Sequence, residues 1–183
     1  GDVLIGGAGD DSASYFFADG SVSANIGNGT GTGGHAAGDI FIGIENLIGS
    51  DFGDLLRGGQ ATANNPDTSN GLLGHGGGDL LLGDEGNDTI TGGAGGDIMT
   101  GGAGQDYFVF ENLDSEQDII TDFDQNGDDA LLFTRLGPGF DFSDVQLHTV
   151  NGDDVFVQIT GWIGGVVLKD AAGLVGADDF FFA

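Results

Sequence analysis

The sequence predicts an all-β fold, in which a solenoid of short parallel strands is closed at its C-terminal end by a small antiparallel β cap. Three observations predict it. Nine-residue units follow one another without a slip from 74 to 109. Glycine supplies 39 of the 183 residues, and it permits the tight turns that such a coil needs. Beyond 130 the repeat ends, and apolar and polar residues alternate as they do in antiparallel strands.

The tandem units carry an acidic residue at position six and a large apolar residue at position eight. They read GHGGGDLLL, GDEGNDTIT, GGAGGDIMT and GGAGQDYFV. Position six is therefore Asp79, Asp88, Asp97 and Asp106, and position eight is Leu81, Ile90, Met99 and Phe108. A disordered linker has no reason to place an apolar residue at every ninth position, so the pattern indicates a folded repeat.

Weaker copies of the unit extend the pattern toward the N-terminus. Asp54 fits position six in GSDFGDLLR, and Asn70 fits it after a longer loop around 58–69. Less regular units place an acidic residue there at four more positions, which are Asp39, Glu45, Asp2 and Asp11. For these four, a role in solubility or turn capping is as good an interpretation as a ligand role.

Two units make one flattened coil of 18 residues. Three strand residues advance about 10 Å, six glycine-rich residues reverse the chain, and successive coils stack at about 4.8 Å. Position eight then points into a narrow interior from both sides. Asp79 is expected above Asp97 on one edge of the coil, and Asp88 above Asp106 on the other.

The chain carries 30 acidic and 3 basic residues, a formal charge of −27. Such a surface repels nucleic acid and anionic membranes, and it attracts cations. Two carboxylates about 5 Å apart repel each other by about 3 kcal/mol at an effective dielectric of 20, and a divalent cation between them reverses the sign. Carboxylate and carbonyl oxygens suit Ca²⁺ better than Mg²⁺, which demands a tighter octahedron. The sequence has no cysteine and no apolar run long enough to span a membrane.

The tandem block resembles the RTX family of secreted bacterial proteins, whose repeat is G-G-x-G-x-D-x-U-x. The resemblance implies a parallel β-roll that binds several calcium ions, each shared by one turn and the turn 18 residues later. It implies carbonyl ligands at the second and fourth turn positions, which are His75, Gly77, Asp84, Gly86, Gly93, Gly95, Gly102 and Gly104. Side-chain ligands are expected at Asp79, Asp88, Asp97, Asp106, Asp54, Asn70, Asp118, Asp39, Asp11 and Asp2.

Two domains are expected, a roll over 1–121 and an antiparallel cap over 122–183. Residues 12–34 interrupt the repeat and predict an inserted hairpin that covers the open end of the roll or packs on its edge. Asp118 fits position six after an enlarged turn, in an Asp-x-Ile-x-Asp-Phe stretch that similarly follows the repeats of RTX proteins. The next segment, DFDQNGDDALLF, begins like an EF-hand loop but has Phe133 at position twelve, so a turn that closes the roll is the better interpretation.

The resemblance implies a calcium-binding C-terminal domain of a protein exported by a type I secretion apparatus. Residues Asp178 to Ala183 resemble the C-terminal signal of such proteins, although a last core strand explains the same residues. The domain is expected to stay expanded inside the bacterium and to fold on calcium outside it, in support of an upstream passenger. Gly1 falls in the middle of a repeat, so further chain is expected before it.

No catalysis is predicted for this chain, because it has no H-E-x-x-H zinc motif, no G-x-S-x-G elbow and no phosphate-binding loop. Two alternatives stay open. The chain is the tail of a secreted enzyme, such as a metalloprotease, lipase or alginate epimerase, or it is an adhesin or polysaccharide-binding module. Both alternatives are compatible with calcium-dependent folding.

Overall fold

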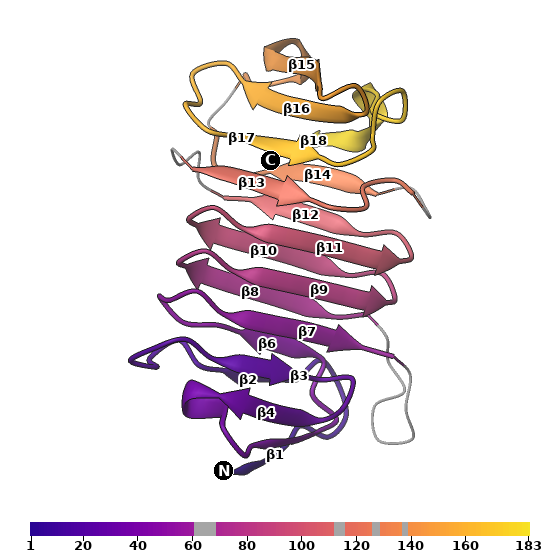
Figure 1. The fold of residues 1–183 in the computed structure, drawn as a ribbon. Helices are drawn as coiled ribbons and strands as arrows, with labels where there is room; N and C mark the ends of the chain where they lie inside the picture. The colour runs from indigo at the N-terminus through magenta and orange to yellow at the C-terminus, as the bar shows by residue number, and fades with distance from the viewer. Residues whose placement is uncertain (61–68, 112–115, 126–128, 137–138) are drawn as a thin grey trace.

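The computed structural model describes residues 1–60, 69–111, 116–125, 129–136 and 139–183. Two β-sheets face each other along the length of the molecule, with the N-terminus at one end and the C-terminal antiparallel strands at the other (Figure 1). In the roll, successive units of strand and turn carry the chain from one sheet to the other. Within the described ranges, no helix is long and apolar enough to cross a membrane.

The larger sheet has eleven strands and the smaller has seven. The larger has the order β1-β5-β4-β3-β7-β9-β11-β13-β17-β16-β15, with β1 Val3–Ile5, β3 Ser23–Asn25, β4 Thr30–Gly33, β5 Ile40–Ile42, β7 Leu55–Gly59, β9 Leu80–Glu85, β11 Ile98–Ala103, β13 Gln117–Ile120, β15 Val145–Val150, β16 Asp154–Ile159 and β17 Gly165–Leu168. The smaller has the order β18-β14-β12-β10-β8-β6-β2, with β2 Ser12–Ser14, β6 Asn46–Ile48, β8 Gly71–Gly76, β10 Thr89–Ala94, β12 Tyr107–Phe110, β14 Ala130–Phe133 and β18 Phe180–Phe182.

Strands of the tandem block alternate between the two sheets and pair in parallel. Leu80 of β9 pairs with Ile98 of β11, and Thr89 of β10 pairs with Tyr107 of β12. Both pairs join residues 18 positions apart, as two nine-residue units per coil require. The predicted parallel β-roll is confirmed.

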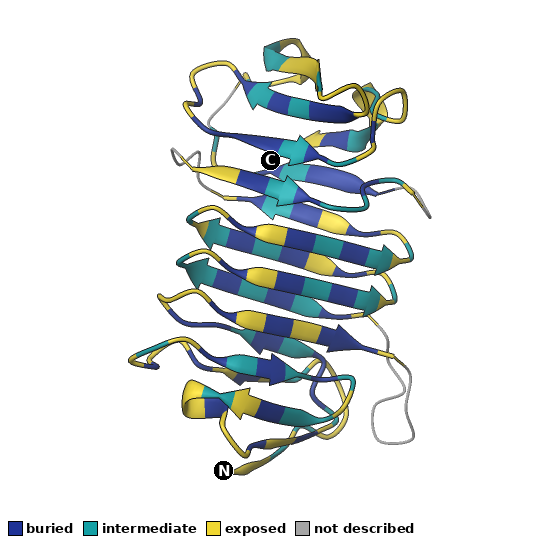
Figure 2. Ribbon diagram, viewed as in Figure 1, coloured by how far each residue is buried: buried dark blue, intermediate teal, exposed yellow. Residues whose placement is uncertain are grey.

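Position eight of each unit lines the interior, as predicted. Leu81, Ile90, Met99 and Phe108 are fully buried. The residues before them face outward, since Leu80 is 37% exposed and Tyr107 is 38% exposed. This alternation produces the bands of buried and exposed residues across the strands (Figure 2).

The strands of the tandem block are longer than the three residues expected. Strands β8 to β11 each contain six residues, because pairing continues into the first three turn positions. Gly93 pairs with His75, and Gly102 pairs with Asp84, although all four have positive φ. The turn backbones of successive coils are therefore stacked in register.

Strands β3 and β4 of the insertion in 12–34 join the larger sheet, whereas β2 is the edge strand of the smaller one. Strands β3 and β4 form the antiparallel hairpin, with its turn between Asn25 and Thr30, where Asn25 Oδ1 accepts a hydrogen bond from Asn28 N at 2.9 Å. β3 also pairs in parallel with β7, so one strand of the hairpin belongs to the roll.

Parallel pairing continues past the boundary expected at 121. β13 pairs with β17 and β14 pairs with β18, both in parallel, and only β15 and β16 add antiparallel pairs at this end. The terminal apolar run forms β18 and buries Phe180, so these residues are a last strand of the smaller sheet. Trp162 packs beside the rings of Phe110 and Phe133.

Candidate metal centre

Carboxylates at position six form a ladder along each edge of the roll. On one edge Asp79 N donates to Asp97 Oδ1 at 2.9 Å, and on the other Asp88 N donates to Asp106 Oδ1 at 2.9 Å. The expected stacking of these residues is confirmed. The same bond recurs from Asp54 N to Asp79, from Asp97 N to Asp118, from Asn70 N to Asp88 and from Asp106 N to Asp129.

In three of the tandem units, the second carboxylate oxygen has no such donor among the described residues. The Oδ2 atoms of Asp79, Asp88 and Asp106 are buried and accept no hydrogen bond from the described part of the chain. A buried carboxylate oxygen without a partner is costly, since it has lost water and gained nothing in return. These three atoms therefore need a cation or a proton.

The glycine at position one makes room for each of these oxygens. A Cβ at Gly83 would overlap both Asp88 Oδ2 and the carbonyl oxygen of Gly101, one coil further on. A Cβ at Gly74 would likewise overlap Asp79 Oδ2 and lie 2.5 Å from the carbonyl oxygen of Gly92. Two acceptor oxygens of neighbouring coils thus lie close together beside the glycine, and a hard cation is a partner that both can share.

Carbonyls at positions two and four point along the stack of turns. The carbonyl oxygen of His75 lies against the Cα of Gly93, and that of Gly77 lies against Gly95. The same arrangement joins Asp84 to Gly102 and Gly86 to Gly104. All eight positions have positive φ, which orients these carbonyls away from the usual strand direction. Four of the eight predicted carbonyl ligands, those of His75, Gly77, Asp84 and Gly86, therefore point toward the next coil in two matching pairs.

Burial raises the pKa of the ladder carboxylates. It raises the pKa of Asp79 and that of Asp88 each to about 7; repulsion from neighbouring aspartates adds to this, and a backbone hydrogen bond opposes it. Burial also raises the pKa of Asp106, and that of Asp129 to about 6. In the folded chain without metal, Asp79 and Asp88 are therefore partly protonated near neutral pH.

Calcium binding is expected to compete with these protons. An unfolded aspartate loses its proton near pH 4, whereas Asp79 and Asp88 in the metal-free fold lose theirs near pH 7. Proton binding therefore stabilises the metal-free fold fully below pH 4, and this stabilisation is lost as the pH rises through 7. Calcium must displace the protons below pH 7. We expect the apparent affinity per tandem site to fall about tenfold from pH 8 to pH 6. Calorimetry at the two pH values checks this, and equal affinities would contradict it.

Other predicted side chains have partners within the protein. Both oxygens of Asp54 accept hydrogen bonds, Oδ1 from Val22 N and Oδ2 from Ser50 N. Ser50 stands at position two of its unit, and its hydroxyl also reaches both carboxylate oxygens. Asp39 accepts from Asp2 N through one oxygen and from the Tyr15 hydroxyl through the other. These sites differ from the tandem ones because a protein donor occupies the second oxygen.

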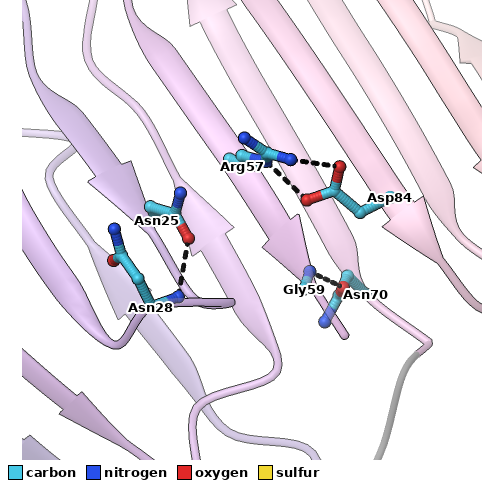
Figure 3. Close-up of polar contacts among 6 residues, drawn as sticks. All are labelled: Asn25, Asn28, Arg57, Gly59, Asn70 and Asp84. Carbon is cyan, nitrogen blue, oxygen red and sulfur yellow. Dashed lines mark hydrogen bonds and ion pairs between the residues drawn. The ribbon is translucent and has the colours of Figure 1, made fainter. Parts of the chain in front are cut away.

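The remaining N-terminal candidate ligands, Asn70, Asp2 and Asp11, differ in their burial and in their hydrogen-bond partners. Asn70 Oδ1 accepts from Gly59 N at 2.8 Å (Figure 3). The side-chain amide of Asn70 donates to the carbonyl of Glu45. Asp2 is exposed, whereas Asp11 Oδ2 is buried without a partner in the described ranges. The expected long loop around 58–69 falls largely on 61–68, outside the described residues.

One basic side chain lies on the outer face of the larger sheet near these turns. Arg57 Nε and Nη2 donate to the two oxygens of Asp84 at 2.5 and 2.8 Å (Figure 3). Asp84 is the position-two residue whose carbonyl, not its side chain, was predicted as a ligand. Its carboxylate is therefore engaged outside the row of carbonyls.

Sequence analysis missed Asp129 and Asp122. Asp129 continues one ladder by accepting from Asp106 N at 2.9 Å, and Asp122 accepts from Gly101 N at 3.0 Å. A signal was available for Asp129, because Asp129-Ala-Leu has the same D-x-U spacing as Asp106-Tyr-Phe. The enlarged turn before it hid that match, since the count of nine residues no longer held.

The donor set is suited to calcium. In the described ranges, no three His, Cys, Asp or Glu side chains gather closely enough to hold a metal by themselves. Each tandem turn instead combines one buried carboxylate oxygen with backbone carbonyls. An oxygen-only set of this kind fits a hard cation with loose coordination, which is Ca²⁺. Metals that prefer thiolate or imidazole ligands do not suit this oxygen-only set.

Comparisons with known proteins agree with this geometry. The family model of the RTX calcium-binding nonapeptide repeat matches residues 1–13 and 73–108, in four copies. No curated protein sequence matches the chain. The solution structure of the AlgE6R3 subunit from the Azotobacter vinelandii mannuronan C5-epimerase is 31% identical, with a TM-score of 0.55, over 74% of this chain and 81% of that one. The AlgE6R2 subunit of the same enzyme is 24% identical, with a TM-score of 0.52, over 96% of this chain and 93% of that one, and shows the fold alone.

Proposed function

Because the chain belongs to the RTX calcium-binding nonapeptide repeat family, we propose that it is a module that folds when extracellular calcium fills its turns. Repeats of this family bind calcium. The proposed ligands are the position-six carboxylates of the tandem block together with the carbonyls of turn positions one, two and four. Each ion lies between one turn and the turn one coil further on.

The observation that carries this proposal is the close approach of two acceptor oxygens at the position-one glycines Gly74 and Gly83. Asp88 Oδ2 is buried and accepts no hydrogen bond from the described residues, and it lies with the Gly101 carbonyl oxygen beside Gly83, where a Cβ would overlap both. Without a cation, two electronegative atoms face each other away from water. With one, both are satisfied at once, and two successive coils are joined. Folding of the roll is then coupled to the metal.

Export from the cell explains why folding that depends on calcium is useful. The chain carries a formal charge of −27, so it repels itself when calcium is scarce. An expanded chain suits passage through a secretion channel, and calcium outside the cell then drives folding. We propose that residues 178–183 serve as the type I export signal before they form β18, and that the module supports a passenger elsewhere in the protein.

The number of bound ions tests the ligand assignment. Asp88→Asn keeps the size of the side chain but removes the charge from a tandem turn, so the variant is expected to bind one calcium ion fewer in equilibrium dialysis. Asp153→Asn is the matched control, because Asp153 is exposed in the turn between β15 and β16. An unchanged ion count in Asp88→Asn would remove this residue from the proposed set.

A second candidate function is favoured by the 31% identity with the AlgE6R3 subunit. That subunit belongs to an enzyme named for mannuronan, a uronate polymer. The present chain would then be an accessory module of an enzyme acting on such a polymer. Calorimetry of the calcium-loaded chain with polymannuronate tests this, with neutral dextran as the control, and no heat with either polymer would count against it.

A further inference from the structure

The strands of residues 1–59 lie together at the N-terminal end of both sheets. β1, β5, β4, β3 and β7 are consecutive in the larger sheet, and β6 and β2 end the smaller one (Figure 1). β3, β4 and β5 follow one another in the sequence and pair in an antiparallel manner. This part of the chain also buries apolar side chains, which include Phe41, Leu47 and Leu56. Three or more strands that cover an apolar face can be stable by themselves.

One turn in this part of the chain has the same arrangement of acceptor oxygens as the tandem turns. A Cβ at Gly49, position one of the unit that contains Asp54, would overlap Asp54 Oδ2 and lie 2.7 Å from the carbonyl oxygen of Gly74. A carboxylate oxygen and a carbonyl oxygen likewise lie beside Gly74 and Gly83. The turns therefore agree in where the position-six carboxylate lies, and they can be compared by their hydrogen-bond donors.

Ser50 supplies the donors that the tandem turns lack. Its hydroxyl lies 2.9 Å from Asp54 Oδ1 and 3.1 Å from Asp54 Oδ2, and its backbone N–H donates to Oδ2. In contrast, the Oδ2 atoms of Asp79 and Asp88 accept no hydrogen bond from the described residues. A hydroxyl and a backbone N–H satisfy a buried carboxylate oxygen without any ion.

The carbonyl oxygen of Ser50 also has a partner within the protein. It accepts a hydrogen bond from Gly76 N at 3.2 Å. Ser50 lacks the positive φ of the tandem residues at position two, among them His75 and Asp84, whose carbonyls point toward the next coil. A cation at this turn would therefore have to displace two donors from the carboxylate and would lose one carbonyl ligand. Both differences arise at position two of the unit.

Other acidic residues at position six in 1–59 also have protein donors. Asp39 accepts from Asp2 N through one oxygen and from the Tyr15 hydroxyl through the other, each at 2.7 Å. Glu45 Oε2 accepts from Asp11 N at 2.9 Å. Asp11 is the exception, because its Oδ2 is buried without a partner among the described residues. It lies beside β2, the edge strand of the smaller sheet, and not at the border with the tandem block.

We propose that residues 1–59 are a folding unit that does not need calcium, and that the Ser50 hydroxyl makes its last turn independent of metal. The inference rests on the proposed calcium-dependent folding of the tandem block. β6 and β7 then present the edges on which β8 and β9 assemble when calcium binds. Strands β1 to β7 contain only three to five residues each, so most of the strand signal still depends on calcium.

Hydrogen–deuterium exchange of the whole chain, followed by mass spectrometry of peptic peptides, tests this division of the roll. In EGTA, peptides from 1–59 are expected to exchange about tenfold more slowly than peptides from 70–110, because only the first group stays folded. In calcium, both groups are expected to exchange slowly. Fast exchange of both groups in EGTA would overturn the folding unit and leave the proposed function standing. Slow exchange of 70–110 in EGTA would overturn the proposed function itself.

Two substitutions test the role of Ser50. Ser50→Gly removes the hydroxyl and creates the Gly-Gly pair that begins the tandem units at 92 and 101. It is expected to bind one calcium ion more in equilibrium dialysis, and β6 and β7 are expected to exchange about tenfold faster in EGTA. Ser21→Gly is the matched control, because Ser21 is exposed in the same part of the chain, and it is expected to match the unmodified chain. Asp54→Asn is expected to leave the ion count unchanged.

Two results would overturn the role assigned to the Ser50 hydroxyl. The first is a Ser50→Gly variant with the ion count and the exchange rates of Ser21→Gly. The second is an Asp54→Asn variant that binds one ion fewer, as is expected of Asp88→Asn, because Asp54 would then be a ligand in the unmodified chain. The exchange experiment on the unmodified chain does not depend on how either variant folds.

Discussion

Removing calcium with EGTA is expected to abolish most of the strand signal of this protein in circular dichroism, and calcium at about 10 mM is expected to restore it. Extracellular calcium modules bind with Kd values of about 10⁻⁴ to 10⁻³ M. At tenfold excess over Kd, each ion stabilises the fold by about 1.4 kcal/mol. About five ions would supply roughly 7 kcal/mol, which is comparable to the stability of a whole domain.

Magnesium at the same concentration is the control for this experiment. Because Mg²⁺ requires a compact octahedron and gives up water reluctantly, it should restore much less of the strand signal. A signal that is the same in EGTA and in calcium would show that apolar packing of Leu81, Ile90, Met99 and Phe108 holds the roll together without metal.

Gly83→Ala is expected to destabilise the calcium-loaded protein by about 3 kcal/mol and to remove one bound ion. The new Cβ would overlap Asp88 Oδ2 and the Gly101 carbonyl oxygen, so one of the two must move. Overpacking of this kind costs about 1–3 kcal/mol, and the lost ion adds about 1.4 kcal/mol. The φ of Gly83 is not in the left-handed region, so the effect arises from the volume of the methyl group and not from the backbone.

Gly20→Ala is the matched control, since Gly20 also lacks a positive φ and a Cβ there would meet nothing within 4 Å. Urea unfolding in excess calcium, combined with dialysis, measures both effects. A Gly83→Ala variant with the stability and ion count of Gly20→Ala would mean that Asp88 Oδ2 and the Gly101 carbonyl oxygen do not bind an ion together. Combining Gly83→Ala with Asp88→Ala should cost less than the sum of the two, because both changes remove the same site.

Much of the candidate site follows from counting along the sequence. Nine-residue spacing places Asp79 on the same edge as Asp97, and Asp88 on the same edge as Asp106, and the structure stacks them so. The nine-residue spacing no longer predicted the position of a residue where the length of a turn changed. The enlarged turn before Asp129 hid its place in the ladder, and the insertion near the N-terminus concealed β3 as a strand of the roll.

The sequence alone determined the architecture, because a fixed period forces every ninth apolar residue inward and every sixth-position carboxylate to the edge. Only the tertiary structure decided which carboxylates are left with an unsatisfied oxygen. Asp54 has Ser50 as a donor for its second oxygen, whereas Asp88 and Asp106 have none among the described residues. The physical reason is that hydrogen-bond partners come from neighbouring turns and coils. Which N–H or O–H group reaches a given carboxylate oxygen depends on the local backbone geometry and on residues that differ from the repeat consensus. The consensus pattern therefore does not predict it.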